Sequence, residues 1–152
     1  MANVIVENDA KQYIVVRLGD EQYGIDIRYI DNIVRMQKIT RVPKVQPYFR
    51  GIIHLRGEIV PVMSICTKMG LPNNEITNDS RIIILKIEAQ GLIGIIVDEV
   101  KEVVTLASAE IDKVTHNTKD EKSNFINGVG KHEGELISLF DLNSVVGEKE
   151  AV

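Results

Sequence analysis

The chain has 152 residues, of which 44% are hydrophobic, 26% are charged and 5% are aromatic, with no Trp, one Cys and three His. This composition excludes a disordered chain, a disulfide scaffold and a cysteine-based zinc cluster, and the scarcity of aromatic residues disfavours a single-stranded nucleic-acid platform. The formal net charge of −4, without a basic stripe, argues against a nucleic-acid partner. No signal peptide or membrane-length apolar run is found in the sequence, so we expect a cytoplasmic protein with no membrane insertion of its own.

Short β-branched segments predict strands along the whole chain, because Val and Ile favour a pleated, half-buried surface. In chain order the segments are residues 13–16, 25–27, 52–53, 59–62, 82–85, 92–97, 100–106 and 136–140. Short helices are expected at residues 64–69 and 141–146; Asp141 or Asn143 would cap the second, and Gly147 would end it. Residues 29–36 fit either a helix or a strand that continues after a kink. The fold class is therefore predicted to be all-β with short helices.

An internal repeat is the most informative pattern. Residues 51–62 and 128–139 both read Gly, five residues, Gly-Glu and an alternating apolar strand, which predicts matching hairpins with a glycine of positive φ at each turn. Earlier segments, which begin at Tyr13 and Ile83, match at a similar offset. We therefore interpret residues 12–71 and 82–147 as two copies of one all-β unit, with flexible termini at 1–11 and 148–152. A single sandwich with a chance resemblance between hairpins is the alternative.

The residues that carry chemistry form no recognisable catalytic or metal-binding pattern. His54, His116 and His132 lack metal-ligand spacing, and Cys66 has no partner and no neighbouring base. We therefore expect no metal site, and on a duplicated all-β body the pattern favours a binding module. Arg56 stands at a hairpin turn inside an apolar segment: it is either a solvated turn residue or a contact to an anionic or carbonyl-rich partner surface.

Five blocks together resemble the CheW family of chemotaxis coupling proteins, across roughly residues 12–147. The blocks are 23–30 (YGIDIRYI), 39–43 (ITRVP), 49–62 (FRGIIHLRGEIVPV), 94–103 (GIIVDEVKEV) and 125–131 (FINGVGK). The resemblance implies two small five-stranded β-barrels, similar to Src-homology-3 domains and packed together with short helices. It also implies a non-catalytic adaptor that joins the cytoplasmic tips of methyl-accepting chemotaxis receptors to the regulatory domain of the histidine kinase CheA, in arrays at the membrane and without a cofactor.

The resemblance also implies which residues meet each partner. A hydrophobic groove between the two barrels would bind the receptor, and two further segments would bind the kinase. The alternative for every Ile or Val named below is that it only packs in the core. The implied receptor-binding residues are Ile30, Asn32, Arg56, Ile82, Val100 and Val103. The implied kinase-binding residues are Ile39, Thr40, Val42, Asp112 and Asn117.

Four positions depart from the family pattern. Asn32 stands where many members carry Glu, and His54 replaces the usual Asn. Ser64 and Cys66 stand where Asp and Arg are common. These departures bear on partner contacts rather than on the fold, and they fit a paralogue with altered partner choice.

Three other identities remain open at this point. One is the coupling half of CheV, although the end of the chain at Val152 would leave no room for its receiver domain. Another is an excised kinase regulatory domain, although a chain that starts at Met1 would argue against it. The third is a small β-barrel enzyme or ligand-binding protein, which would need a deep polar pocket with a perturbed acid.

Overall fold

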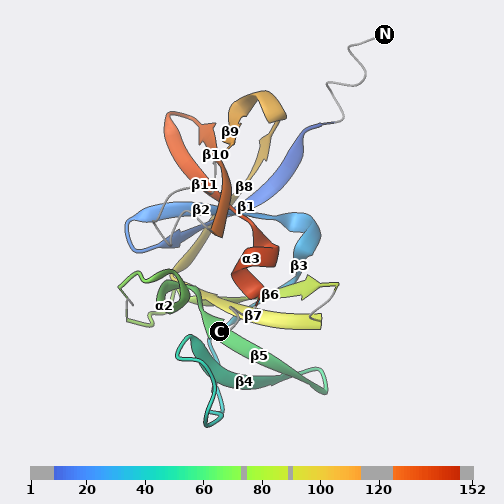
Figure 1. Ribbon diagram of the computed structural model, residues 1–152, viewed down its shortest axis with the longest axis vertical. Coiled ribbons are helices and arrows are strands. Elements are labelled where there is room, and N and C mark those ends of the chain that lie inside the picture. The colour runs from blue at the N-terminus through green and yellow to red at the C-terminus, as the bar shows by residue number, and fades with distance from the viewer. Residues whose placement is uncertain (1–8, 73–74, 89–90, 114–124, 148–152) are drawn as a thin grey trace.

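The computed structural model describes residues 9–72, 75–88, 91–113 and 125–147 (Figure 1). The predicted all-β class with short helices is confirmed, and within residues 29–36 the segment Ile30–Arg35 is a strand that follows a short 3-10 helix. Within the described part of the chain, no helix is long and apolar enough to cross a membrane. The helical segments are η1 (Ile27–Tyr29), α2 (Ile65–Met69), η2 (Ser108–Glu110) and α3 (Leu142–Val146). The strands are β1 (Lys11–Leu18), β2 (Glu21–Asp26), β3 (Ile30–Arg35), β4 (Phe49–Leu55), β5 (Glu58–Ser64), β6 (Arg81–Ile87), β7 (Gly91–Val97), β8 (Glu99–Leu106), β9 (Ile111–Lys113), β10 (Ile126–His132) and β11 (Glu135–Phe140).

The strands form two sheets that exchange strands between the halves of the sequence. One sheet has the order β8-β1-β2-β11-β10-β9 and the other β3-β6-β7-β5-β4. The second half of the chain repeats the strands of the first: the counterparts of β1 to β5 are, in order, β6, β7, β8, β10 and β11. With this correspondence the two sheets have the same strand order, and β9 is an additional edge strand. The sheets therefore do not coincide with the predicted units 12–71 and 82–147. The five-stranded sheet is instead one continuous stretch, inserted between β2 and β8 of the six-stranded sheet (Figure 1).

The parallel strand pair at the middle of each sheet is built in the same way. In one sheet Leu139 of β11 pairs with Gly24 of β2, and in the other Val62 of β5 pairs with Gly94 of β7. A Cβ atom on Gly24 would lie 2.7 Å from Leu139 Cδ2, and one on Gly94 would lie 3.3 Å from Val62 Cγ2. Both glycines thus leave space that a neighbouring side chain fills, which explains why the Gly-Ile pair occurs in both halves.

The segment that follows β3 closes the five-stranded sheet into a barrel. Thr40 exchanges two backbone hydrogen bonds with Ile52 of β4, each 2.8 Å long. The other sheet makes the equivalent contact through β9, where Asp112 pairs with Val129. Gly51 permits the close approach: its φ is +141°, and a Cβ atom there would lie 2.1 Å from the Thr40 carbonyl oxygen.

Buried side chains form three clusters. A small cluster fills each barrel: one includes Tyr13 and Leu106, the other Ile53 and Ile82. The largest cluster, named the central core, lies between the sheets and also takes residues from α2 and α3. Because each barrel interior is small, burial in the central core stabilises both sheets together. The central core consists of Val16, Leu18, Tyr23, Ile25, Tyr48, Met63, Ile65, Cys66, Met69, Ile83, Leu85, Ile87, Ile93, Ile95, Val97, Phe125, Ile126, Phe140, Leu142, Val145 and Val146.

Both short helices have a side-chain N-cap, of which Asp141 was predicted and Ser64 was not, and a buried lysine joins them. The Ser64 hydroxyl accepts a hydrogen bond from the Thr67 amide at 3.1 Å, and the Asp141 carboxylate accepts one from the Ser144 amide at 3.4 Å. Lys68 of α2 is only 9% exposed. Its ammonium donates to the carbonyl oxygens of Val145 and Gly147, at the end of α3. A cation at this end of a helix is favourable because the last carbonyl groups lack intrahelical partners.

The close approach at Gly51 gives the first prediction. We expect Gly51→Ala to lower the free energy of unfolding by about 2–4 kcal/mol, because Thr40 must move and break its backbone bonds. Gly134→Ala is the matched control, since Gly134 also has a positive φ, +82°, but nothing lies within 4 Å of its Cβ position. It is expected to cost about 1 kcal/mol. Urea unfolding measures both, and equal losses would contradict the contact with Thr40.

Candidate partner-binding surfaces

Partly exposed aliphatic side chains lie around the central core, on and beside the edge strands β3 and β8. Each of these strands pairs with one neighbour in its own sheet, β3 with β6 and β8 with β1. Ile30 of β3 and Val100 of β8 both pack against the central core, although neither is fully buried. Val103 is 53% exposed and lies opposite Ile14 of β1. The surface made by Ile14, Ile30, Ile33, Val100 and Val103 is named the seam surface.

Arg56 reaches this surface from the turn between β4 and β5. Leu55 pairs with Glu58, so the turn has two residues, and both Arg56 (φ 51°) and Gly57 (φ 82°) have the positive φ of a type I′ turn. The Arg56 Nη2 atom lies 2.8 Å from the Asp31 Oδ2 atom, next to Ile30 on β3. Because the Arg56 side chain remains 63% exposed, this ion pair orients the guanidinium without hiding it. As a surface pair it contributes at most about 1 kcal/mol to stability.

Two of the six predicted receptor-binding residues have side chains that are buried or hydrogen-bonded within the protein. Ile82 is 0% exposed and belongs to the cluster inside the five-stranded barrel, so its prediction as a surface residue is wrong. The reason is that β6 lies between β3 and β7 and is covered on both faces. Asn32 is partly buried, and its side-chain oxygen accepts a hydrogen bond of 2.8 Å from the Ile33 amide.

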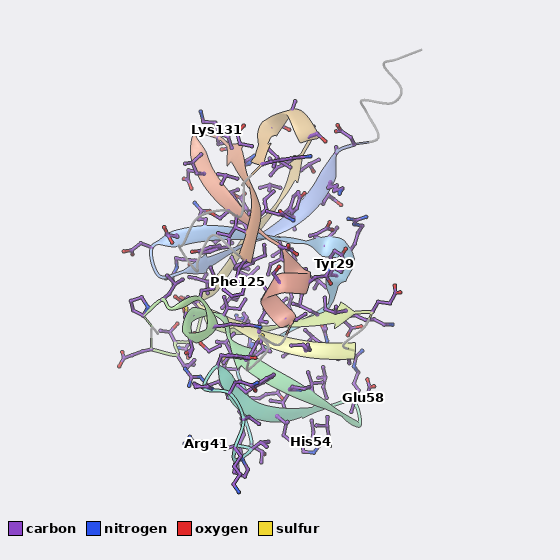
Figure 2. The ribbon with its side chains drawn as sticks, in the orientation of Figure 1. Tyr29, Arg41, His54, Glu58, Phe125 and Lys131 are labelled. Atoms are coloured by element: carbon purple, nitrogen blue, oxygen red, sulfur yellow. The ribbon has the colours of Figure 1, made fainter. Side chains whose placement is uncertain are left out.

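The predicted kinase-binding residues fall into two places. Ile39, Thr40 and Val42 lie together in the loop that follows β3 and crosses the edge of β4. Asp112 is exposed on β9, where it occupies the position equivalent to Thr40 in the other barrel. Asn117 lies outside the described residues. Figure 2 shows the distance between the two regions: Arg41, in the loop, is labelled at one end of the molecule and Lys131, on the β10 strand that pairs with β9, at the other.

A groove under the loop was not anticipated from the sequence. It has a volume of about 760 Å³ and is named the loop groove. Its position depends on the Thr40–Ile52 closure, which no local pattern indicates, although its cationic residues are visible in the sequence. Ile14 and Ile33 of the seam surface were also missed, because an aliphatic run does not reveal which face a side chain takes. The loop groove is lined by Met36, Ile39, Arg41, Val42, Pro43, Lys44, Val45, Gln46, Pro47, Phe49, Arg50, Ile76 and Ile96.

Two of the family departures are explained by the fold. Ser64 is 5% exposed and caps α2, a role that Asp fills equally well. Cys66 is 6% exposed in the central core, and burial, with a smaller effect from Asp98, raises the pKa of its thiol to about 11. The thiol is therefore protonated at neutral pH, which is unsuited to nucleophilic chemistry.

Other titratable groups are engaged in local structure. Burial raises the pKa of Asp26, but hydrogen bonds from the Arg28 side chain and backbone outweigh it and lower that pKa overall. Burial also raises the pKa of the Tyr23 phenol, which donates to Glu21 at 2.8 Å. Within the described ranges no three His, Cys, Asp or Glu side chains gather into a group that would hold a metal ion.

Comparison with known proteins agrees with this architecture. Residues 12–150 match the family model for the CheW-like domain. The chain is 33% identical to the chemotaxis protein CheW of Bacillus subtilis (strain 168) over 141 residues, covering 93% of this chain and 90% of that protein. It is 30% identical to CheW of Helicobacter pylori over 135 residues, covering 89% and 81%. Its structure is similar to the crystal structure of the scaffolding protein TtCheW from Thermoanaerobacter tengcongensis, with a TM-score of 0.83, 32% identity and coverage of 91% and 94%.

The family match, the relatives and the structural match define a chemotaxis scaffold and coupling protein. The chain belongs to the CheW-like domain family, as the family model and the relatives above show. The predicted family and fold class are thereby confirmed.

The buried thiol gives the second prediction. We expect Cys66 of the folded protein to react with a disulfide reagent at about pH 8 at least a hundredfold more slowly than in denaturant, because only the thiolate reacts. Absorbance of the released thiol measures the rate, and glutathione in the same buffers serves as the control. Rapid labelling of the folded protein would show that Cys66 is accessible and would contradict its place in the central core.

Proposed function

We propose that this chain couples the cytoplasmic tips of methyl-accepting chemotaxis receptors to the regulatory domain of the histidine kinase CheA, without catalysing a reaction. The observation that carries the proposal is the CheW-like match over residues 12–150. It is supported by two separate apolar surfaces, the seam surface and the loop groove. The corresponding location is the cytoplasm, from which the protein would be recruited to receptor arrays at the membrane.

The receptor is proposed to bind at the seam surface. Ile30, Val100 and Val103 would form the apolar anchors for the receptor's helical hairpin, since apolar side chains on a helix bind such surfaces at regular spacing. Arg56, held by Asp31, would supply the polar contact that fixes the register of the bound helix. Asn32 is neutral, so any contact there would be a hydrogen bond rather than an ion pair.

The kinase is proposed to bind at the loop that carries Ile39, Thr40 and Val42. A second kinase contact, at the opposite barrel, would involve Asp112 and Asn117. Thr40 and Asp112 occupy equivalent barrel-closing positions, so the two proposed kinase contacts would lie at equivalent places on the two barrels. Val42 is 40% exposed and provides an accessible apolar side chain in the loop.

Coupling between the two proposed surfaces has a short physical route. β3 begins at Ile30 on the seam surface and ends at Arg35, and the chain then enters the loop that contains Ile39 and Val42. A shift of β3 on receptor binding would therefore move the loop through a single strand. Such a route provides coupling free energy between two sites, which is what a receptor–kinase adaptor requires.

Arg56 provides the third prediction. We expect Arg56→His to weaken binding of a receptor-tip fragment by about tenfold, equivalent to about 1.4 kcal/mol, because the shorter ring loses the guanidinium fork. Affinity for the CheA regulatory domain and the urea midpoint are expected to stay unchanged. Isothermal titration with each partner measures the two affinities separately.

The matched controls are Lys131→His, at the far end of the molecule (Figure 2), and Asp31→Asn. Lys131→His is expected to bind the receptor like the original chain. Asp31→Asn is expected to weaken receptor binding less than Arg56→His does, because it frees the guanidinium without removing it. Unchanged receptor affinity in Arg56→His would reduce Arg56 to a turn residue, and failure of the unaltered chain to bind either partner would overturn the proposed function.

A further inference from the structure

A strongly basic segment lies within this acidic protein. Between Asp31 and Glu58 there are six Lys or Arg residues and no Asp or Glu, whereas the whole chain has a net charge of −4. This part of the sequence is therefore a local basic segment, although no basic stripe was expected from the net charge. The six basic residues are Arg35, Lys38, Arg41, Lys44, Arg50 and Arg56.

Three of these cations surround the loop groove. Arg41, Lys44 and Arg50 line it together with apolar residues, and no acidic residue is among its lining side chains. Within the described part of the chain, none of the three takes part in an ion pair with an acidic side chain; Arg50 donates a hydrogen bond of 3.0 Å to the neutral Thr67 hydroxyl. Their positive charge is therefore not neutralised within the described fold.

The floor of the loop groove is aliphatic and open to water. Val42 is 40% exposed, Val45 is 42% exposed and Ile76 is 55% exposed. Met36, Ile39 and Phe49 lie deeper and connect this floor with the barrel interior or the central core. Exposed aliphatic side chains gathered in a hollow are typical of a surface that a partner covers.

We infer that the loop groove receives an aliphatic segment of a protein partner that carries Asp or Glu beside its apolar side chains. The aliphatic side chains of that segment lie on Val42, Val45 and Ile76, and its carboxylates meet the cations around the groove. This inference rests on the proposed function, in which the partner at this loop is the CheA regulatory domain. It adds that the partner's contact segment is acidic and that its association is steered by charge.

The concave shape favours a protein segment over the other anionic partners. The apolar floor lies within a groove, so a flat bilayer surface cannot cover it, whereas a projecting strand or loop can. Nucleic acid is disfavoured because its sugars and bases offer few aliphatic groups to such a floor and the lining contains a single aromatic residue, Phe49. The groove is also continuous with Ile39 and Val42, where the kinase contact is proposed.

Salt-dependent titration with charge-reversed variants tests the inference. The CheA regulatory domain is titrated into the full chain at low and at high NaCl, because salt screens charges on exposed surfaces. We expect the affinity of the unaltered chain to fall about tenfold over this range. Lys44→Glu is expected to lose about tenfold at low salt and most of the salt dependence, and Arg41→Glu is expected to behave in the same way.

The matched control is Lys86→Glu, which makes the same change of charge at an exposed position of β6, outside the loop groove and outside β9. Its affinity and salt dependence are expected to equal those of the unaltered chain. A second probe, a synthetic peptide that alternates Glu with Leu, is expected to bind the unaltered chain and to lose binding in Lys44→Glu. Urea midpoints establish that every variant is folded.

The possible outcomes separate the inference from the proposed function. Kinase binding that is insensitive to salt and to Lys44→Glu overturns the inference and leaves the function intact. Absence of kinase binding, with the acidic peptide still bound at Lys44, overturns the function and supports the inference. Binding of phosphatidylserine vesicles or duplex DNA that Lys44→Glu abolishes, or self-association that it abolishes, assigns the groove to another occupant and overturns the inference.

Discussion

The central core is the constraint on which the rest of the structure depends. Each barrel encloses only a small cluster of its own, so both sheets gain most of their burial from the side chains that they share. α2 and α3 complete this core, and the buried ammonium of Lys68 joins the end of one helix to the other. The seam surface is the outer margin of the same core, because Ile30 and Val100 pack against it. A proposed partner site and the main source of stability are therefore adjacent.

Much of the fold follows from local sequence. The β-branched runs became strands, Gly57 and Gly134 formed the two matching turns, and Ser64 and Asp141 capped the helices. The exchange of strands between halves could not be predicted, because a repeat shows which strands are equivalent but not which copy each one pairs with. Two counterparts with similar side chains offer a neighbouring strand nearly the same surface.

The candidate site was predicted less well, for a related reason. Ile82 and Val100 are both aliphatic residues in strands, yet one is enclosed and the other lies at a sheet edge. Neither strand shows a strict alternation of apolar and polar residues that would reveal its buried face, so only the sheet order distinguishes them. The basic residues of the loop groove were missed for another reason. The net charge sums over the whole chain, and the acidic residues elsewhere outweigh this basic segment. Charge within a segment, not charge of the whole, determines what its surface attracts.

The insertion of one barrel into the other has a mechanical consequence. Among the described strands, the backbone passes from one sheet to the other at two places: through η1, from Asp26 to Ile30, and through Asp98, from β7 to β8. Arg28 braces the first passage by its ion pair with Asp26, and the Gly19 amide braces the second by its bond of 2.7 Å to Asp98. Any rotation of one barrel against the other must therefore pivot on these two points. Ile30 and Val100 lie next to these two connections. A helix bound at the seam surface would therefore contact the residues about which the barrels rotate.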